Sequence, residues 1–191
     1  MQLAMIGLGR MGANIVRRLM RAGHECVVYD VNADAVQALV AEGAVGADSM
    51  ADLASKLEAP RAVWMMVPAS LTGAVADQVA EVLDEGDILI DGGNSNYRDD
   101  VRRAKAFRER GIHYVDVGTS GGVFGLDRGY CLMVGGPDEA VQRIEPVLRT
   151  IAPGVGEIER TPGRTGDLTP EEQGYLCLLY TSDAADERSS V

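Results

Sequence analysis

Three glycines near the N-terminus have the spacing of a phosphate-binding turn. Gly7, Gly9 and Gly12 directly follow a short apolar run at residues 3–6. In such a turn the first glycine permits a sharp bend, the second lets the backbone approach a pyrophosphate, and the third lets the next helix pack closely on the strand. The unpaired N–H groups and positive dipole end of that helix attract phosphates. We therefore expect a dinucleotide site at Gly7, Leu8, Gly9, Arg10, Met11 and Gly12.

An acidic residue, Asp30, ends the next apolar run, Cys26–Tyr29. A carboxylate at this position accepts hydrogen bonds from a ribose 2′-hydroxyl, and it repels the 2′-phosphate of NADP. The next residue is Val31, which cannot clamp that phosphate as an arginine would. The sequence therefore predicts NAD as the cofactor, with NADP less favoured and Arg10 remaining as a phosphate contact. The alternative is that Asp30 only ends the strand and starts a turn with Asn32.

Segments that follow the predicted strands are the other candidate sites, because ligands of an open parallel sheet bind beyond the carboxyl ends of its strands. The strand predicted at 61–67 contains Met65 and Met66 and leads from Val67 into Pro68. These apolar side chains can form a wall against a nicotinamide or adenine ring. The alternative is that the methionines only fill gaps in the core.

A Gly-Gly-Asn-Ser segment follows the strand predicted at 87–91. Gly92 and Gly93 permit a close approach of the backbone. An amide offers both a donor and an acceptor, so Asn94 can orient a carboxamide as well as a hydroxyl. The alternative role of Asn94 or Ser95 is to cap the following helix.

The strand predicted at 112–117 leads into a third polar segment, residues 118–122. The hydroxyl of Ser120 and the exposed N–H groups of Gly121 and Gly122 can hold a substrate carboxylate. An ordinary glycine turn is the alternative.

Strands alternate with helices over residues 1–160, which predicts a Rossmann-type, doubly wound α/β domain with a mostly parallel sheet. Further strands are expected at 25–30 and 130–135, and a short turn at 44–47. Helical periodicity or helix-start signals place helices near residues 11–20, 33–42, 50–57, 71–83, 97–110 and 137–151. Residues 161–176 are rich in proline, glycine and charge and are expected to form a connecting loop.

Composition limits the partners and the compartment. The chain has 191 residues and a net charge of −11, a field that repels nucleic acid and anionic membranes. Neither a targeting segment nor a membrane span is expected. Three scattered cysteines indicate reduced thiols in a cytoplasm. His24 and His113 stand apart without carboxylates at ligand spacing, so no metal site is predicted.

Three motifs, at residues 6–12, 91–95 and 116–122, resemble 6-phosphogluconate dehydrogenases, in particular their shorter bacterial, NAD-preferring form. The resemblance covers residues 1 to about 176, and its Gly-Gly-Asn-Ser element differs from the pattern of 3-hydroxyisobutyrate-type enzymes. It implies oxidation of 6-phosphogluconate, a small phosphorylated sugar acid, by hydride transfer to the nicotinamide. Decarboxylation to ribulose 5-phosphate then follows, a step of the pentose phosphate pathway. The resemblance also implies that Asn94 contacts nicotinamide and substrate, and that Ser120, Gly121 and Gly122 hold the substrate.

The C-terminal segment departs from the family pattern. In the family, the segment that matches Glu172–Leu176 leads into a helix carrying the catalytic lysine, and then into a helical domain with further phosphate ligands. Residues 177–191 instead read as a non-native, disordered tail. We therefore expect an inactive NAD-binding fragment without the catalytic lysine and the helical domain, through which full-length members would form homo-oligomers. The alternatives are another β-hydroxyacid dehydrogenase, with a smaller substrate that lacks phosphate, and a non-catalytic NAD-binding module.

Overall fold

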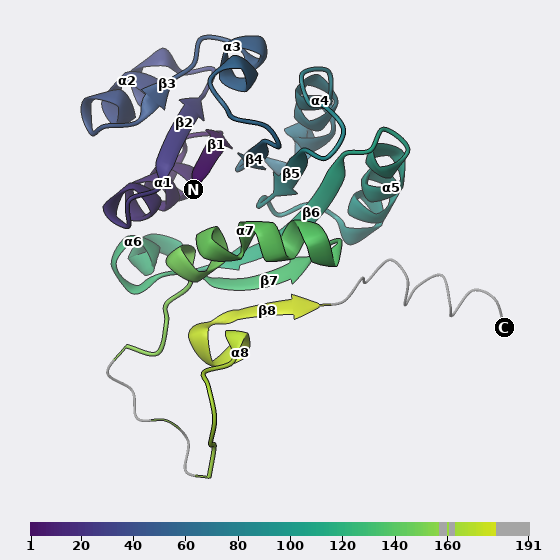
Figure 1. Ribbon diagram of the computed structural model, residues 1–191. Helices are drawn as coiled ribbons and strands as arrows, with labels where there is room; N and C mark the ends of the chain where they lie inside the picture. Colours follow the sequence, from purple (N-terminus) through teal and green to yellow (C-terminus); the bar gives the residue numbers. More distant parts are fainter. Residues whose placement is uncertain (157–159, 161–162, 179–191) are drawn as a thin grey trace, which may run out of the picture.

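One eight-stranded sheet organises the structure, a computed structural model that describes residues 1–156, 160 and 163–178 (Figure 1). The strand order is β3-β2-β1-β4-β5-β6-β7-β8, and every pair is parallel except β6 with β7. The strands are β1 (Gln2–Ile6), β2 (Glu25–Tyr29), β3 (Val45–Gly46), β4 (Ala62–Met65), β5 (Ile88–Asp91), β6 (His113–Ser120), β7 (Cys131–Gly135) and β8 (Tyr175–Leu178). The strand order reverses direction between β1 and β4, as in a Rossmann fold, so the predicted fold class is confirmed.

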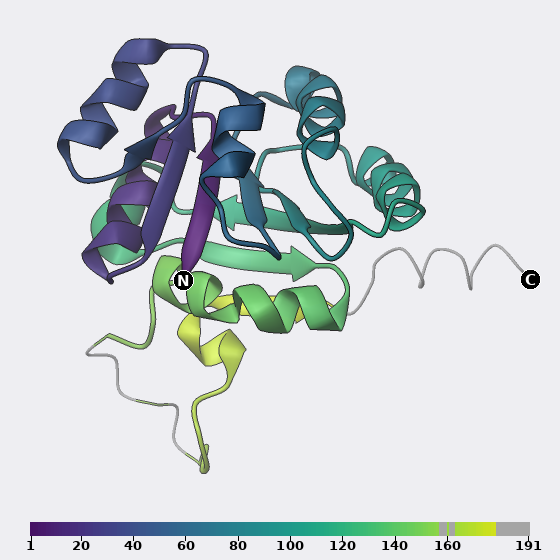
Figure 2. The ribbon, with the colours of Figure 1, turned by 45° about the horizontal axis from the view of Figure 1, so that its top comes forward.

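Helices cover both faces of the sheet (Figures 1 and 2). They are α1 (Arg10–Arg21), α2 (Ala33–Ala41), α3 (Met50–Ser55), α4 (Ala69–Ala80), α5 (Tyr97–Arg108), α6 (Gly125–Arg128), α7 (Asp138–Ile151) and α8 (Pro170–Gln173), with a short 3₁₀ helix η1 (Gly122–Phe124). Helices α1, α2 and α7 contribute to one buried cluster, and α3, α4 and α5 contribute to the other. Within the described part of the chain, every helix is too short or too polar to cross a membrane.

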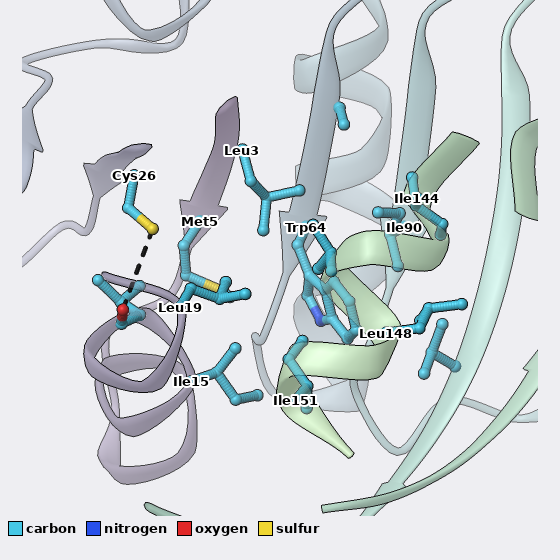
Figure 3. Close-up of a cluster of buried hydrophobic side chains, with 14 of the residues drawn as sticks. Leu3, Met5, Ile15, Leu19, Cys26, Trp64, Ile90, Ile144, Leu148 and Ile151 are labelled. Carbon is cyan, nitrogen blue, oxygen red and sulfur yellow. Dashed lines mark hydrogen bonds between the residues drawn. The ribbon is translucent and has the colours of Figure 1, made fainter. Parts of the chain in front are cut away.

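The two cores follow from the alternation of side chains along each strand. In β1, Leu3 and Met5 face the α1 and α7 side, whereas Ala4 and Ile6 face the other side. Figure 3 shows the first cluster, in which Trp64 lies between the β1 side chains and helix α7. Because both faces are covered, the central strands read as continuous apolar runs.

Arg18 joins α1 to the end of α7. Its guanidinium donates hydrogen bonds to the carbonyl oxygens of Thr150 (2.7 Å) and Ala152 (2.8 Å). These carbonyls lie at the C-terminal end of α7, where helix carbonyls lack intrahelical partners. Burial lowers the pKa of Arg18. The side chain of Arg18 thus fixes the packing of two helices.

Three segments differ from the sequence-based expectations. Val45–Gly46, expected as a turn, pairs with β2 as an edge strand too short to show periodicity. Strand β6 extends to Ser120, because β7 pairs with it in antiparallel register. The expected loop at 161–176 contains α8 and the first two residues of β8, so that part of the prediction was wrong.

Strand β8 extends into the expected tail. The segment 175–178 pairs in parallel with β7, so Cys177 and Leu178 form part of the sheet. Gly174, with φ +94°, ends α8 and directs the chain into this strand. Residues 179–191, which make up the rest of the expected tail, lie outside the described residues.

Candidate functional site

The glycine turn, residues 7–12, connects β1 to α1, and its three glycines have different neighbours. Gly7 has φ +92°, and a Cβ atom there would lie 2.5 Å from the carbonyl oxygen of Met66. A Cβ atom on Gly12 would lie 2.0 Å from the carbonyl oxygen of Gly7. A Cβ atom on Gly9 would meet no protein atom within 4 Å. The protein's own packing therefore requires Gly7 and Gly12, whereas Gly9 faces open space, as expected of the glycine that approaches a ligand.

The N-terminus of α1 offers free donors to that space. Gly9 is the N-cap residue and has no side chain to accept from the first turn, and that turn contains no acidic residue. The first N–H groups of a helix have no intrahelical partners. The amides of Arg10, Met11 and Gly12 can therefore bind an anion, reinforced by the positive end of the twelve-residue helix.

Asp30 follows β2 and contacts the glycine turn. One carboxylate oxygen, Oδ2, accepts a hydrogen bond from the backbone N–H of Leu8 at 2.6 Å, and Oδ1 accepts one from the N–H of Asn32 at 2.8 Å. Each carboxylate oxygen can accept a further bond. Asp30 therefore starts a turn with Asn32 and also lines the cavity described next, and its contact with a ribose stays a prediction. The neighbouring Val31 is 94% exposed.

A cavity of about 700 Å³ gathers the predicted cofactor residues at the carboxyl ends of the strands. Its lining includes Gly7, Gly9, Arg10, Met11, Gly12, Asp30, Val67, Pro68 and Asn94. Leu8 is the exception, because its side chain is buried in the core and only its backbone contacts Asp30. The alternative that the methionines only fill the core is correct for Met65, which is fully buried. Met66 instead lines the cavity.

Part of the cavity wall comes from helices α3 and α4, which were not among the predicted cofactor contacts. Met50 of α3 and Leu71, Val75 and Gln78 of α4 line it. The side chain of Leu71 is 51% exposed. Helix α4 begins at the end of the Val67–Pro68 segment, so its first turns necessarily lie beside the cavity.

The Asn94 turn, residues 92–95, is held by Asp91, the last residue of β5. The N–H of Gly93 donates to Oδ1 of Asp91 at 2.9 Å, and the hydroxyl of Ser95 donates to Oδ2 at 2.7 Å. Asn94 makes neither contact and is exposed at the cavity wall. The cap of α5 is Asn96, which accepts from the N–H of Arg98, so Asn94 and Ser95 do not have the capping role considered above.

Gly92 is required for a reason that the sequence did not indicate. A Cβ atom there would lie 2.0 Å from Nε1 of Trp64 and 2.7 Å from the sulfur of Met66. The backbone of Gly92 thus packs directly on the indole of the neighbouring strand. At Gly92, the close approach expected of the glycines is therefore to Trp64 and Met66 and not to a ligand.

The third segment is only partly in the cavity. Gly118 and Thr119 line it, whereas Ser120, Gly121 and Gly122 are not among the lining residues. Gly121 packs on the ring of Tyr130, since a Cβ atom would lie 2.5 Å from that ring. Gly122 has φ +52° and begins η1. The substrate contacts expected of Ser120, Gly121 and Gly122 stay a prediction.

Most of the chain is similar in sequence to a known family. A family model described as the NAD binding domain of 6-phosphogluconate dehydrogenase matches residues 2–159. A Haloferax volcanii protein named as an NAD(+)-dependent, decarboxylating 6-phosphogluconate dehydrogenase is 46% identical over 155 residues. That match covers 81% of this chain and 51% of the relative.

Two solved structures share the fold. One is Plasmodium falciparum 6-phosphogluconate dehydrogenase, described in its apo form and in complex with NADP+ and with 6-phosphogluconate. Its TM-score is 0.76 with 26% identity, over 82% of this chain and 35% of that one. The other is a 3-hydroxyisobutyrate dehydrogenase from Salmonella typhimurium, with a TM-score of 0.70 and 27% identity, over 78% of this chain and 53% of that one. The chain thus spans about half the length, or less, of these proteins.

Proposed function

Because this chain belongs to the 6-phosphogluconate dehydrogenase family of oxidoreductases, we propose that its cavity binds NAD with the nicotinamide beside Asn94. One observation carries the proposal. A single cavity is lined by the glycine turn, by Asp30 and by Asn94, which follow three different strands of the sheet. This arrangement supports a dinucleotide that extends across the strand ends from the ribose of its adenosine half to its nicotinamide.

The preference for NAD over NADP rests on Asp30 and Val31. Two backbone N–H groups fix the Asp30 carboxylate at the cavity wall. In that place its charge favours a ribose 2′-hydroxyl and opposes a 2′-phosphate. Val31 adds no compensating cation. The name of the Haloferax relative specifies NAD(+), whereas the Plasmodium structure was described with NADP+.

The part of the cavity proposed to hold the nicotinamide has an apolar wall and one polar side chain. Val67, Pro68 and Leu71 supply apolar surface, and the amide of Asn94 supplies a donor and an acceptor for the carboxamide. NAD, when bound, supplies the hydride acceptor. The residues of this chain hold the ring and shield it from water.

For the whole protein we propose oxidative decarboxylation of 6-phosphogluconate, in the cytoplasm and as part of the pentose phosphate pathway. The family's catalysis requires a lysine for proton transfer, and among the described residues no lysine lines the cavity. Lys56 donates to the carbonyl oxygen of Gly46 and to Asp52 on α3, and neither Lys56 nor Lys105 lines the cavity. We therefore propose that the 191-residue chain binds the cofactor but does not turn over substrate by itself. The oligomeric state of the whole protein is likewise a proposal.

A second candidate is a β-hydroxyacid dehydrogenase acting on an acid without phosphate. The likeness to the Salmonella 3-hydroxyisobutyrate dehydrogenase favours it. Both candidates bind the dinucleotide in the same cavity, and they differ in the residues that hold the substrate.

Calorimetry on the 191-residue chain tests the cofactor assignment. We expect NAD to bind at least tenfold more tightly than NADP. Stronger binding of NADP would contradict the role given to Asp30, and binding of neither dinucleotide would contradict the proposed function.

A further inference from the structure

Two buried carboxylates behind the Asn94 turn share one tyrosine hydroxyl. The hydroxyl oxygen of Tyr114 on β6 lies 3.0 Å from Oδ2 of Asp91 and 3.0 Å from Oδ1 of Asp100. Asp91 is completely buried and Asp100 is 6% exposed. A hydroxyl carries a single hydrogen, so Tyr114 can donate to only one carboxylate at a time.

Asp91 connects the hydroxyl of Tyr114 to the Asn94 turn at the cavity wall. Its Oδ1 holds the N–H of Gly93, and its Oδ2 accepts from Ser95 as well as facing Tyr114. The Ser95 hydroxyl also lies 3.2 Å from that of Thr72, a buried residue of α4. One buried carboxylate therefore holds the residues on both sides of Asn94, through the N–H of Gly93 and the hydroxyl of Ser95.

Charged groups from several elements surround Tyr114. Helix α5 contributes Asp100 and Arg103, whose Nη1 lies 2.9 Å from Oδ1 of Asp100, and β6 contributes Asp116 in register with Asp91 of β5. Burial and the charge of Asp91 raise the pKa of Asp100. Burial and the charges of Asp100 and Asp91 raise the pKa of Asp116 to about 7. Burial and the neighbouring carboxylates thus favour the protonated forms of Asp100 and Asp116.

We propose that Tyr114 is a positioning residue for Asn94. By fixing Asp91 it holds the Asn94 turn in the conformation that receives the nicotinamide. This inference rests on the proposed function and assigns it a supporting residue on β6. Tyr114 does not line the cavity, so it acts through Asp91.

Comparison of NADH with ADP-ribose separates positioning from general stability, because ADP-ribose lacks the nicotinamide. Tyr114→Phe removes the hydroxyl but keeps the ring, which stacks on Phe107 with ring centroids 5.6 Å apart. We expect Tyr114→Phe in the 191-residue chain to weaken NADH binding about fivefold, the effect of one lost hydrogen bond. ADP-ribose affinity should stay within about twofold.

A matched control and a double variant complete the test. Tyr175→Phe also removes the hydroxyl of a buried tyrosine, one that contacts Glu145 and Arg149 away from the cavity, and it should leave both affinities unchanged. Asn94→Ala should abolish the difference by which the chain binds NADH more tightly than ADP-ribose. Adding Tyr114→Phe to Asn94→Ala should weaken NADH no further, because the two residues act as a unit.

A second variant covers the case in which Tyr114→Phe does not fold. Asp100→Asn keeps the size of the side chain but removes one of the two competing charges, so Tyr114 donates to Asp91, the stronger acceptor. NADH affinity should be retained in this variant, and a loss like that expected of Tyr114→Phe would overturn the inference. So would unchanged NADH binding in Tyr114→Phe, or an equal loss for both ligands. If the wild-type chain binds neither NADH nor ADP-ribose, the proposed function fails as well.

Discussion

The carboxylate of Asp30 accepts a hydrogen bond of 2.6 Å from the backbone N–H of Leu8, in the middle of the glycine turn. The residue proposed to bind the ribose therefore also fixes the loop that is proposed to bind the phosphates. Any substitution of Asp30 therefore changes the proposed ribose contact and the glycine turn at once. Variants at this position need to be chosen so that the two effects can be separated.

Asp30→Asn keeps the size and one acceptor oxygen but removes the charge. We expect about tenfold weaker NAD binding, since hydrogen bonds to charged groups contribute about 1.5–3 kcal/mol. NADP binding should weaken less or improve, because the repulsion of the 2′-phosphate disappears. Calorimetry with both dinucleotides checks this, and equal losses for NAD and NADP would show that Asp30 acts only on the loop.

Gly9→Ala and Gly12→Ala form a matched pair. The added Cβ of Gly9→Ala meets open space, so the variant should fold normally but lose NAD binding, because the methyl group would occupy the position proposed for the pyrophosphate. The added Cβ of Gly12→Ala would lie 2.0 Å from the carbonyl oxygen of Gly7 and should destabilise the fold itself. Urea unfolding and NAD titration distinguish the two effects. Unimpaired NAD binding in Gly9→Ala would contradict the placement of the phosphates.

Arg18→Met tests the contact between α1 and α7. The variant keeps the aliphatic part of the side chain but leaves the carbonyl oxygens of Thr150 and Ala152 without their donor. The free energy of unfolding should fall by about 1–3 kcal/mol.

Arg17→Met is the control for this change. Arg17 pairs with Glu42 at the surface, where loss of an ion pair costs about 0–1 kcal/mol. Equal losses in the two variants, measured by urea unfolding, would show that Arg18 has no special role.

Asp116 makes stability depend on pH in a defined direction. Its pKa in the folded protein is about 7, above the ordinary value of 3.8, so the folded state holds a proton that the unfolded chain releases. The free energy of unfolding should therefore decrease as pH rises from about 4 to about 7, and change little above that range.

Asp116→Asn cannot lose this proton. The difference in free energy of unfolding between the variant and the wild type should shift in favour of the variant across the same pH interval. The variant itself should keep a smaller pH dependence from Asp100, whose pKa is also raised. Urea unfolding at several pH values measures it. A difference that is constant with pH would mean that Asp116 is already ionised in the folded protein.

The fold and much of the cavity could be predicted because their signals are local. The glycine turn, Asp30 and Asn94 each follow a buried strand, and parallel strands bring their carboxyl ends to one edge. The sequence also contained an unused signal. Thr169 and Glu172 form a capping box with Pro170 at the first helical position, which marks the helix α8 that was expected to be loop.

Other features depend on contacts between distant residues. That Gly92 packs on Trp64, or that Leu71 lines a cavity instead of the core, depends on how α4 and β4 lie beside the Asn94 turn. The extension of β6 to Ser120 depends on its antiparallel partner β7. The hydroxyl of Tyr114 between two carboxylates also depends on a strand and a helix that meet only in the folded chain.

Chemical-shift mapping tests the central claim most directly. NADH is titrated into the ¹⁵N-labelled 191-residue chain, and the backbone amide signals are followed. The account predicts saturable shifts at Gly7, Gly9, Arg10, Gly12, Asp30 and Asn94, which line one cavity. Shifts confined to another surface, such as the cleft lined by Arg102, Arg103 and Arg110, would contradict it, as would the absence of any saturable shift.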